Sequence, residues 1–283
     1  MKKIPFLHIL LFVLTFATTL AAGALQQGID IIESPGKIFK GLPFAGTLMI
    51  ILAVHELSHY LASRRHHVTA TLPYFIPAPS LIGTFGAFIK MKSPITTRKA
   101  LIDIGASGPI AGFIASLVAS IVGLSLSHLV PLAKIEESLV LGDSLLFSFL
   151  SRFIVGNIPQ GADILLHPVA FAGWIGLFVT SLNLLPIGQL DGGHIAYAVL
   201  GDRHRYVSLT LVAALALFGL LALVGRSGWE GWGLWALMML FLGIKHPPVL
   251  YWELPLDRSR KHIALASLII FIITFIPTPF QVQ

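Results

Sequence analysis

Residues 42–62 read LPFAGTLMIILAVHELSHYLA, an apolar run that carries His55, Glu56 and His59 towards its end. About 20 apolar residues are enough for a helix to cross a bilayer, so this run predicts a transmembrane helix. Ionisable residues inside such a helix are costly and usually functional. On a helix, positions i and i+4 lie about 40° apart around the axis and about 6 Å apart along it. The two imidazoles therefore point the same way and can bind one metal ion.

The same three residues form the H-E-x-x-H pattern, which is typical of zinc metalloproteases. Glu56 adjoins the first predicted ligand, so its carboxylate can reach a water molecule on the metal and act as a general base. The alternative is a buried polar cluster that holds helices together.

The composition indicates a polytopic membrane protein. The chain has 283 residues, of which 55% are apolar and 11% charged, whereas a soluble domain carries roughly 25% charged residues. Its mean hydropathy is +0.85. These values exclude disorder and a basic soluble domain that binds nucleic acid, and they make the lipid bilayer the expected environment. Because the chain has no cysteine, iron–sulfur clusters, Cys-based zinc sites and Cys nucleophiles are also excluded.

We expect an all-α fold of about seven transmembrane helices within a single integral membrane domain, residues 1–283. The N-terminal span is 4–24 and the C-terminal spans lie within 206–278. The candidate spans are 4–24, 42–62, 101–130, 168–189, 206–225, 229–245 and 262–278. The first of them also resembles a signal peptide, because lysines precede it and small residues end it; we expect a retained helix.

The distribution of basic residues predicts the orientation. Most of the 19 Lys and Arg residues lie at the N-terminus or in the connections 63–100, 190–205 and 246–261. Cytoplasmic loops collect Lys and Arg. We therefore expect a cytoplasmic N-terminus and an external C-terminus.

Two connections are not simple loops. Residues 68–92 are apolar yet rich in Pro and Gly, and irregular backbone survives at membrane depth only where protein or a wet cavity satisfies its polar groups. We predict a small re-entrant β-hairpin there; the alternative is a proline-rich loop on the membrane surface. On the outer side, 139–155 within the connection 131–166 mixes apolar and polar residues, which predicts an amphipathic helix.

A zinc ion with an open position for water needs a third protein ligand. His66 and His67 are out of register with the first two histidines and follow two arginines, so we expect them to be solvated. Asp103 begins a span, where a carboxylate suits the helix dipole, and we expect it to be structural. Asp191 follows helix-breaking Pro and Gly residues and falls at a depth similar to that of the two histidines. We therefore predict Asp191 as the third ligand, with His194 as the alternative.

Taken together, these motifs resemble those of the site-2 protease family of intramembrane zinc metalloproteases, and most closely its compact members without a PDZ domain. The resemblance covers a catalytic core of about 42–200. It is carried by His55-Glu56-x-x-His59, Gly83-x-Phe85-Gly86-Ala87, Gly108-Pro109-x-x-Gly112 and Asn183-x-x-Pro186-x-x-x-Leu190-Asp191-Gly192.

The resemblance implies one zinc per chain, bound by His55, His59 and Asp191, with Glu56 as general base. It also implies that the hairpin lies beside an extended substrate, as β-strand addition requires. The substrate-binding residues it implies are Gly83, Phe85, Gly86 and Asn183. From the residues alone, Asn183 is equally a polar contact between helices. Family members often have Arg where this chain has His194, which suggests an auxiliary role for this histidine.

The expected function is hydrolysis of peptide bonds in transmembrane segments of protein substrates, near the cytoplasmic side. The alternatives are a metal-binding or metal-transporting membrane protein and a pseudoprotease that binds single-span partners. Inverted repeats, which are typical of many transporters, are not evident in the sequence. The expected location is a bacterial or archaeal plasma membrane, since no Ser-rich transit peptide precedes the first span; a plastid membrane is the alternative.

Overall fold

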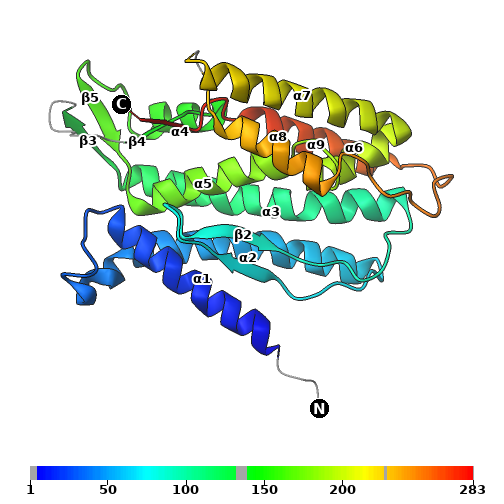
Figure 1. Ribbon diagram of the computed structural model, residues 1–283, viewed down its shortest axis with the longest axis horizontal. Coiled ribbons are helices and arrows are strands. Elements are labelled where there is room, and N and C mark those ends of the chain that lie inside the picture. Colours follow the sequence, from blue (N-terminus) through cyan, green and yellow to red (C-terminus); the bar gives the residue numbers. More distant parts are fainter. Residues whose placement is uncertain (1–4, 132–138, 226–227, 283) are drawn as a thin grey trace. The chain divides into compact units, whose positions relative to one another are not determined.

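The computed structural model describes residues 5–131, 139–225 and 228–282, and helices make up most of them (Figure 1). The α-helices are α1 (Phe6–Leu25), α2 (Leu42–Arg65), α3 (Arg98–Ser125), α4 (Leu145–Ile154), α5 (Pro168–Asn183), α6 (Asp191–Leu200), α7 (His204–Leu223), α8 (Gly231–Leu242) and α9 (Arg258–Thr274). The 3-10 helices in the described part of the chain are η1 (Pro35–Gly41) and η3 (Gly201–Arg203).

Within the described residues, four helical segments are long and apolar enough to cross a membrane: Phe6–Leu25, Pro35–Arg65, Arg98–Ser125 and Asp191–Leu223. The predicted spans 168–189 and 229–245 contain the shorter apolar helices α5 and α8. A mostly helical chain with membrane-compatible helices is therefore confirmed, and the number of seven spans stays a prediction. Lys2 and Lys3, on which the predicted orientation partly depends, lie outside the described residues.

The predicted loop 190–205 is wrong, because most of it is helical. Leu190 caps the start of α6 in an extended conformation, and Gly201, with φ +62°, ends this helix. Apart from η3, the chain then continues directly into α7.

The two strands of the predicted hairpin are confirmed as β1 (Tyr74–Pro77) paired antiparallel with β2 (Thr84–Phe88), and its re-entrant position in the membrane stays a prediction. The register pairs Tyr74 with Phe88 and shifts between Phe75 and Pro77. The helix expected within 139–155 is also present, as α4. Two further small sheets were not predicted: β3 (His128–Pro131) with β5 (Ala162–Leu165), and β4 (Leu139–Leu141) with β6 (Phe280–Val282).

The chain divides into two compact units, each built from several segments. The first comprises 1–93, 111–130 and 150–177, and the second comprises 94–110, 131–149 and 178–283. The first unit therefore contains α1, α2, the hairpin and the C-terminal part of α3. In this unit α1 packs against α2 and β1, and β2 contacts α2. Figure 1 shows α1, in dark blue, beside the hairpin in cyan.

Small residues let α3 and α5 pack closely in the first unit. A Cβ on Gly176 would overlap the hydroxyl of Ser116, and a Cβ on Gly173 would lie 2.6 Å from the backbone nitrogen of Ser120. Such seams of small residues are typical of helix packing in membranes, where close approach of the backbones stabilises the helix pair through van der Waals contacts. This seam fixes the part of α3 that lies beside α2.

In the second unit, α9 is fixed to the start of α3. The guanidinium of Arg260 binds the carboxylate of Asp103 and also contacts Asp257, the N-cap of α9. Arg98 donates a hydrogen bond to the carbonyl of Ala198 at 2.8 Å and lies over the ring of Trp252 at 4.4 Å. These contacts connect α3, α6 and the segment before α9.

Candidate metal centre

One face of α2 is buried, and the two histidines continue it. Phe44, Leu48 and Leu52 are at most 5% exposed and follow the helical spacing that places His55 and His59 on the same side. Burial of the apolar part of this face is what fixes the rotation of the helix. The same rotation turns both imidazoles away from the surrounding lipid or solvent.

The His55, Glu56 and His59 side chains form a compact group. Each of these residues is 5% exposed. The Nε2 atoms of His55 and His59 are 3.1 Å apart, and His55 Nε2 lies 4.0 Å from Glu56 Oε1. This is the arrangement that the i, i+4 spacing predicts.

A glycine on α3 makes room for His55. A Cβ on Gly112 would lie only 2.9 Å from His55 Nδ1. The carbonyl of Gly112 accepts a 2.7 Å hydrogen bond from Ser116 on the next turn. The Gly108-Pro109-x-x-Gly112 motif therefore has a packing role that its sequence alone did not reveal.

Asp191 is the first residue of α6, where its negative charge suits the positive end of the helix dipole. The two glycines after it are needed for packing. A Cβ on Gly192 would overlap the carbonyl of Leu184, and one on Gly193 would overlap that of Gly188. The turn before α6 thus packs directly against the first turn of this helix. This packing fixes the position of Asp191 at the start of α6.

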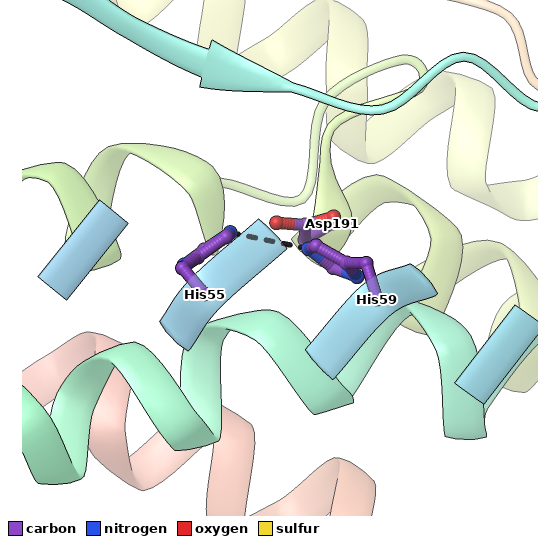
Figure 2. Close-up of side chains that lie close together, drawn as sticks. All are labelled: His55, His59 and Asp191. Carbon is purple, nitrogen blue, oxygen red and sulfur yellow. Dashed lines mark hydrogen bonds between the residues drawn. The ribbon is translucent and has the colours of Figure 1, made fainter. Parts of the chain in front are cut away.

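Figure 2 shows the side chains of His55, His59 and Asp191 close together. One ligand atom of each lies within 4.8 Å of the others, so the three residues could hold one metal ion. The donor set fits zinc. Two imidazole nitrogens bound tetrahedrally at 2.0–2.1 Å would be about 3.3 Å apart, close to the 3.1 Å between the two Nε2 atoms. Two neutral imidazoles and a carboxylate also leave a fourth position for water.

The other ligand candidates have different surroundings. Asp103 is bound by Arg260, as expected for a structural residue. Asp103 is the sixth residue of α3, beyond its first turn. Its negative charge is therefore stabilised by the ion pair with Arg260 and not by the helix dipole. His66 is the C-cap of α2, and His67 is exposed with φ +57°. His194 lies in the first turn of α6 and contacts a histidine from another segment.

Nothing in the sequence pattern predicts this contact. His194 Nδ1 lies 2.6 Å from His246 Nε2, and His246 Nδ1 lies 2.6 Å from the carbonyl oxygen of Pro247. A carbonyl only accepts, so His246 carries its proton on Nδ1 and His194 donates from Nδ1. Burial lowers the pKa of His246 to about 4, and His204 adds to this effect against the opposing hydrogen bond to Pro247. The fixed tautomer leaves Nε2 of His194 as its basic nitrogen.

The predicted substrate-binding residues lie in two places. Gly83, Phe85 and Gly86 belong to the hairpin, where Phe85 is 74% exposed and both glycines have positive φ. Asn183 is the last residue of α5 and is partly buried. Their contact with substrate stays a prediction.

Comparison with known proteins agrees with this geometry. The model of peptidase family M50 matches residues 43–225. The chain is 32% identical over 183 residues to a probable chloroplastic zinc metalloprotease, EGY2, of Arabidopsis thaliana, covering 63% of this chain and 33% of that protein. It is 39% identical over 165 residues to the probable chloroplastic zinc metalloprotease EGY1 of the same plant, covering 56% and 30%. The chain thus spans about a third of the length of these curated relatives. No solved structure matches it.

Proposed function

Because this chain belongs to peptidase family M50, we propose that it is an intramembrane zinc metalloprotease that binds one zinc ion. It hydrolyses peptide bonds within transmembrane segments of protein substrates, near the cytoplasmic side of the membrane. The observation that carries the proposal is the cluster of His55, His59 and Asp191, next to the buried carboxylate of Glu56.

In this proposal His55, His59 and Asp191 bind the metal and Glu56 is the general base. Zinc held by these ligands supplies a Lewis acid that acidifies water and polarises the carbonyl of the peptide bond. Glu56 accepts the proton of the attacking water and passes a proton to the leaving amine. Its position one residue after His55, buried to the same degree, supports this role.

The substrate has to be unwound before cleavage, because a transmembrane helix keeps its carbonyls in internal hydrogen bonds. The β1–β2 hairpin, with Gly83, Phe85 and Gly86, binds the extended segment by strand addition. Contact of β2 with α2 supports this assignment, since α2 carries both histidines. Asn183 provides a polar contact to the same segment.

We place the chain in a prokaryotic plasma membrane with its N-terminus in the cytoplasm. The uneven distribution of Lys and Arg supports this orientation. The relatives described above are named as chloroplastic, so a plastid membrane is the alternative. Fusion of a reporter to each terminus, followed by fractionation, distinguishes the two locations and tests the orientation.

Metal content tests the site without a known substrate. The full chain, purified in detergent, is expected to contain about one zinc by mass spectrometry. His55→Ala and Asp191→Ala are expected to lose it, whereas His262→Ala, at an exposed position, retains it. No zinc in the wild type after zinc supply would contradict the proposal and favour a pseudoprotease. Zinc retained in Asp191→Ala would make His194 the ligand to test.

Cleavage tests the catalytic role. A single-span peptide with Gly or Pro in its cytoplasmic half, which weakens its helix, is incubated with the purified chain in lipid nanodiscs. Glu56→Gln is expected to keep zinc and lose at least 100-fold in rate, because general-base catalysis contributes about 10²–10⁴-fold. The exposed Glu33→Gln should cleave at the wild-type rate. Equal rates for Glu56→Gln and wild type would contradict the assignment.

A further inference from the structure

Some backbone carbonyls of the hairpin need hydrogen-bond donors from outside its two strands. Among the described residues, β1 and β2 pair only with each other, so their outer edges and the turn leave carbonyls without a strand partner. In apolar surroundings each unsatisfied carbonyl costs free energy. The carbonyl of Gly83 accepts one hydrogen bond within the hairpin, from the backbone N–H of Ala78 at 3.1 Å, and further donors come from a different segment.

Three polar side chains of α1 and its C-cap supply these further donors. Thr18 Oγ1 donates to the carbonyl of Gly83 at 2.6 Å, and Gln26 Nε2 donates to that of Leu81 at 2.7 Å. His8 Nδ1 lies 3.1 Å from the carbonyl of Pro73, and because a carbonyl only accepts, this nitrogen carries the proton. The three acceptors lie at the start of β1 and in the turn between the strands.

The contact at Gly83 also involves the backbone. Gly83 has φ +80°, and a Cβ at this position would lie 2.5 Å from the carbonyl oxygen of Thr18 and 2.6 Å from Cα of Thr19. Only glycine allows both this conformation and this approach. The turn of the hairpin is therefore seated directly on the backbone of α1.

Aromatic contacts continue the same interface along β1. The rings of His8 and Tyr74 are 4.2 Å apart, and those of Phe12 and Phe75 meet edge to face at 5.1 Å. In contrast, Phe85 on β2 is 74% exposed. One side of the hairpin is thus occupied by α1, and the β2 side remains accessible.

We propose that α1 positions the hairpin, with Thr18 as its central positioning residue and Gln26 and His8 as supporting ones. The functional part of this proposal rests on the proposed function, in which β2 binds the substrate. By holding β1 and the turn, α1 keeps β2 in place beside α2 before substrate arrives. The binding energy of the substrate is then not consumed in ordering the hairpin.

A spectroscopic measurement tests the position itself. Because the chain has no native cysteine, nitroxide labels can be placed at Leu81→Cys in the turn and Leu61→Cys on α2, which are 51% and 63% exposed. Pulsed electron paramagnetic resonance then gives the distance distribution between them. We expect Thr18→Val to broaden or shift the distribution and Thr18→Ser, which keeps the hydroxyl, to restore it.

Thr47→Val is the matched control, because Thr47 bonds only to the carbonyl of Pro43 on its own helix in the described structure. It should leave the distribution unchanged. Gln26→Ala provides a second, milder variant and is expected to broaden the distribution. Distributions for Thr18→Val and Gln26→Ala that match the wild type would overturn the proposal.

Kinetics then test the consequence for substrate. Loss of one neutral hydrogen bond corresponds to about a two- to ten-fold change. We expect Thr18→Val to raise KM by this factor, with kcat and zinc content unchanged, and Thr18→Ser to restore it. If the wild type cleaves no peptide, the proposed function fails, while the distance measurement still decides the role of α1. An altered distance with unchanged KM would refute the link to substrate binding.

Discussion

Arg260 binds Asp103 with two hydrogen bonds, Nε to Oδ1 at 2.9 Å and Nη2 to Oδ2 at 2.6 Å, although 157 residues separate them in the chain. The side chains are 30% and 17% exposed. This bidentate pair raises the pKa of Arg260 and connects the N-terminal end of α9 to α3.

We expect Arg260→Gln to destabilise the protein by about 2 kcal/mol, because a charge-assisted hydrogen bond to a partly buried carboxylate is lost. Arg258→Gln removes the same charge from an exposed position two residues away and should change stability by less than about 0.5 kcal/mol. Thermal unfolding in detergent measures both. Equal unfolding temperatures for the two variants would show that the pair contributes little.

Gly112→Ala is expected to lower zinc affinity on the order of ten-fold, since outer contacts that orient a ligand contribute at least this much. The added methyl group would lie 2.9 Å from His55 Nδ1 and push the imidazole aside. Gly46→Ala on α2 has no atom within 4 Å of its new methyl and serves as control. Zinc titration with a competing chelator compares the two. Wild-type zinc affinity in Gly112→Ala would contradict this prediction. It would mean that α3 shifts to accommodate the methyl group and leaves the His55 imidazole in place.

Acidification is expected to weaken the fold through His246. Burial lowers its folded pKa to about 4 from an ordinary value of 6.5, so between these values the unfolded chain binds a proton that the folded chain excludes. Stability therefore falls as the pH drops from 6.5 to 4 and is retained above 6.5. His246→Gln should show a smaller loss between pH 7 and 5 than wild type or His262→Gln. If stability fell equally with pH in the wild type, His246→Gln and His262→Gln, His246 would not be the cause.

The first helix is expected to remain in the mature protein. Thr15, Thr19 and Leu20 are buried, and a Cβ on Gly41 would overlap the backbone of α1 at Leu20. Packing of this kind favours a helix that is retained in the folded unit. Intact mass measurement of the membrane-extracted chain, with an N-terminal tag, should retain residues 4–24. A species that begins near residue 25 would restore the signal-peptide interpretation.

Local pattern was sufficient for the main elements of the site. The apolar run around His55 and His59 predicted α2, and the Pro and Gly content of 68–92 predicted the hairpin. Asp191 was found because few carboxylates remained on the inner side. The first two inferences depend on the pattern within one segment, which a single sequence displays directly, and the third depends on elimination among the remaining carboxylates.

Long-range partners could not be found in this way. Leu139 pairs with Val282 across about half of the chain, and His194 contacts His246 from a separate segment. Nothing in the local periodicity of either member specifies the other. The helical start of α6 was not predicted either, because 190–205 was expected to be a connection between two spans, whereas α6 begins at Asp191.

The seating of the hairpin on α1 has a consequence for biosynthesis. The carbonyl partners of His8 and Thr18 follow them by 65 residues. At about 5–20 residues per second, a ribosome needs roughly 3–13 s to synthesise that interval. During this interval the side chains of His8 and Thr18 are without the hairpin carbonyls that they contact in the finished structure. Because α1 is synthesised first, these hydrogen bonds form only after the hairpin residues have been added to the chain.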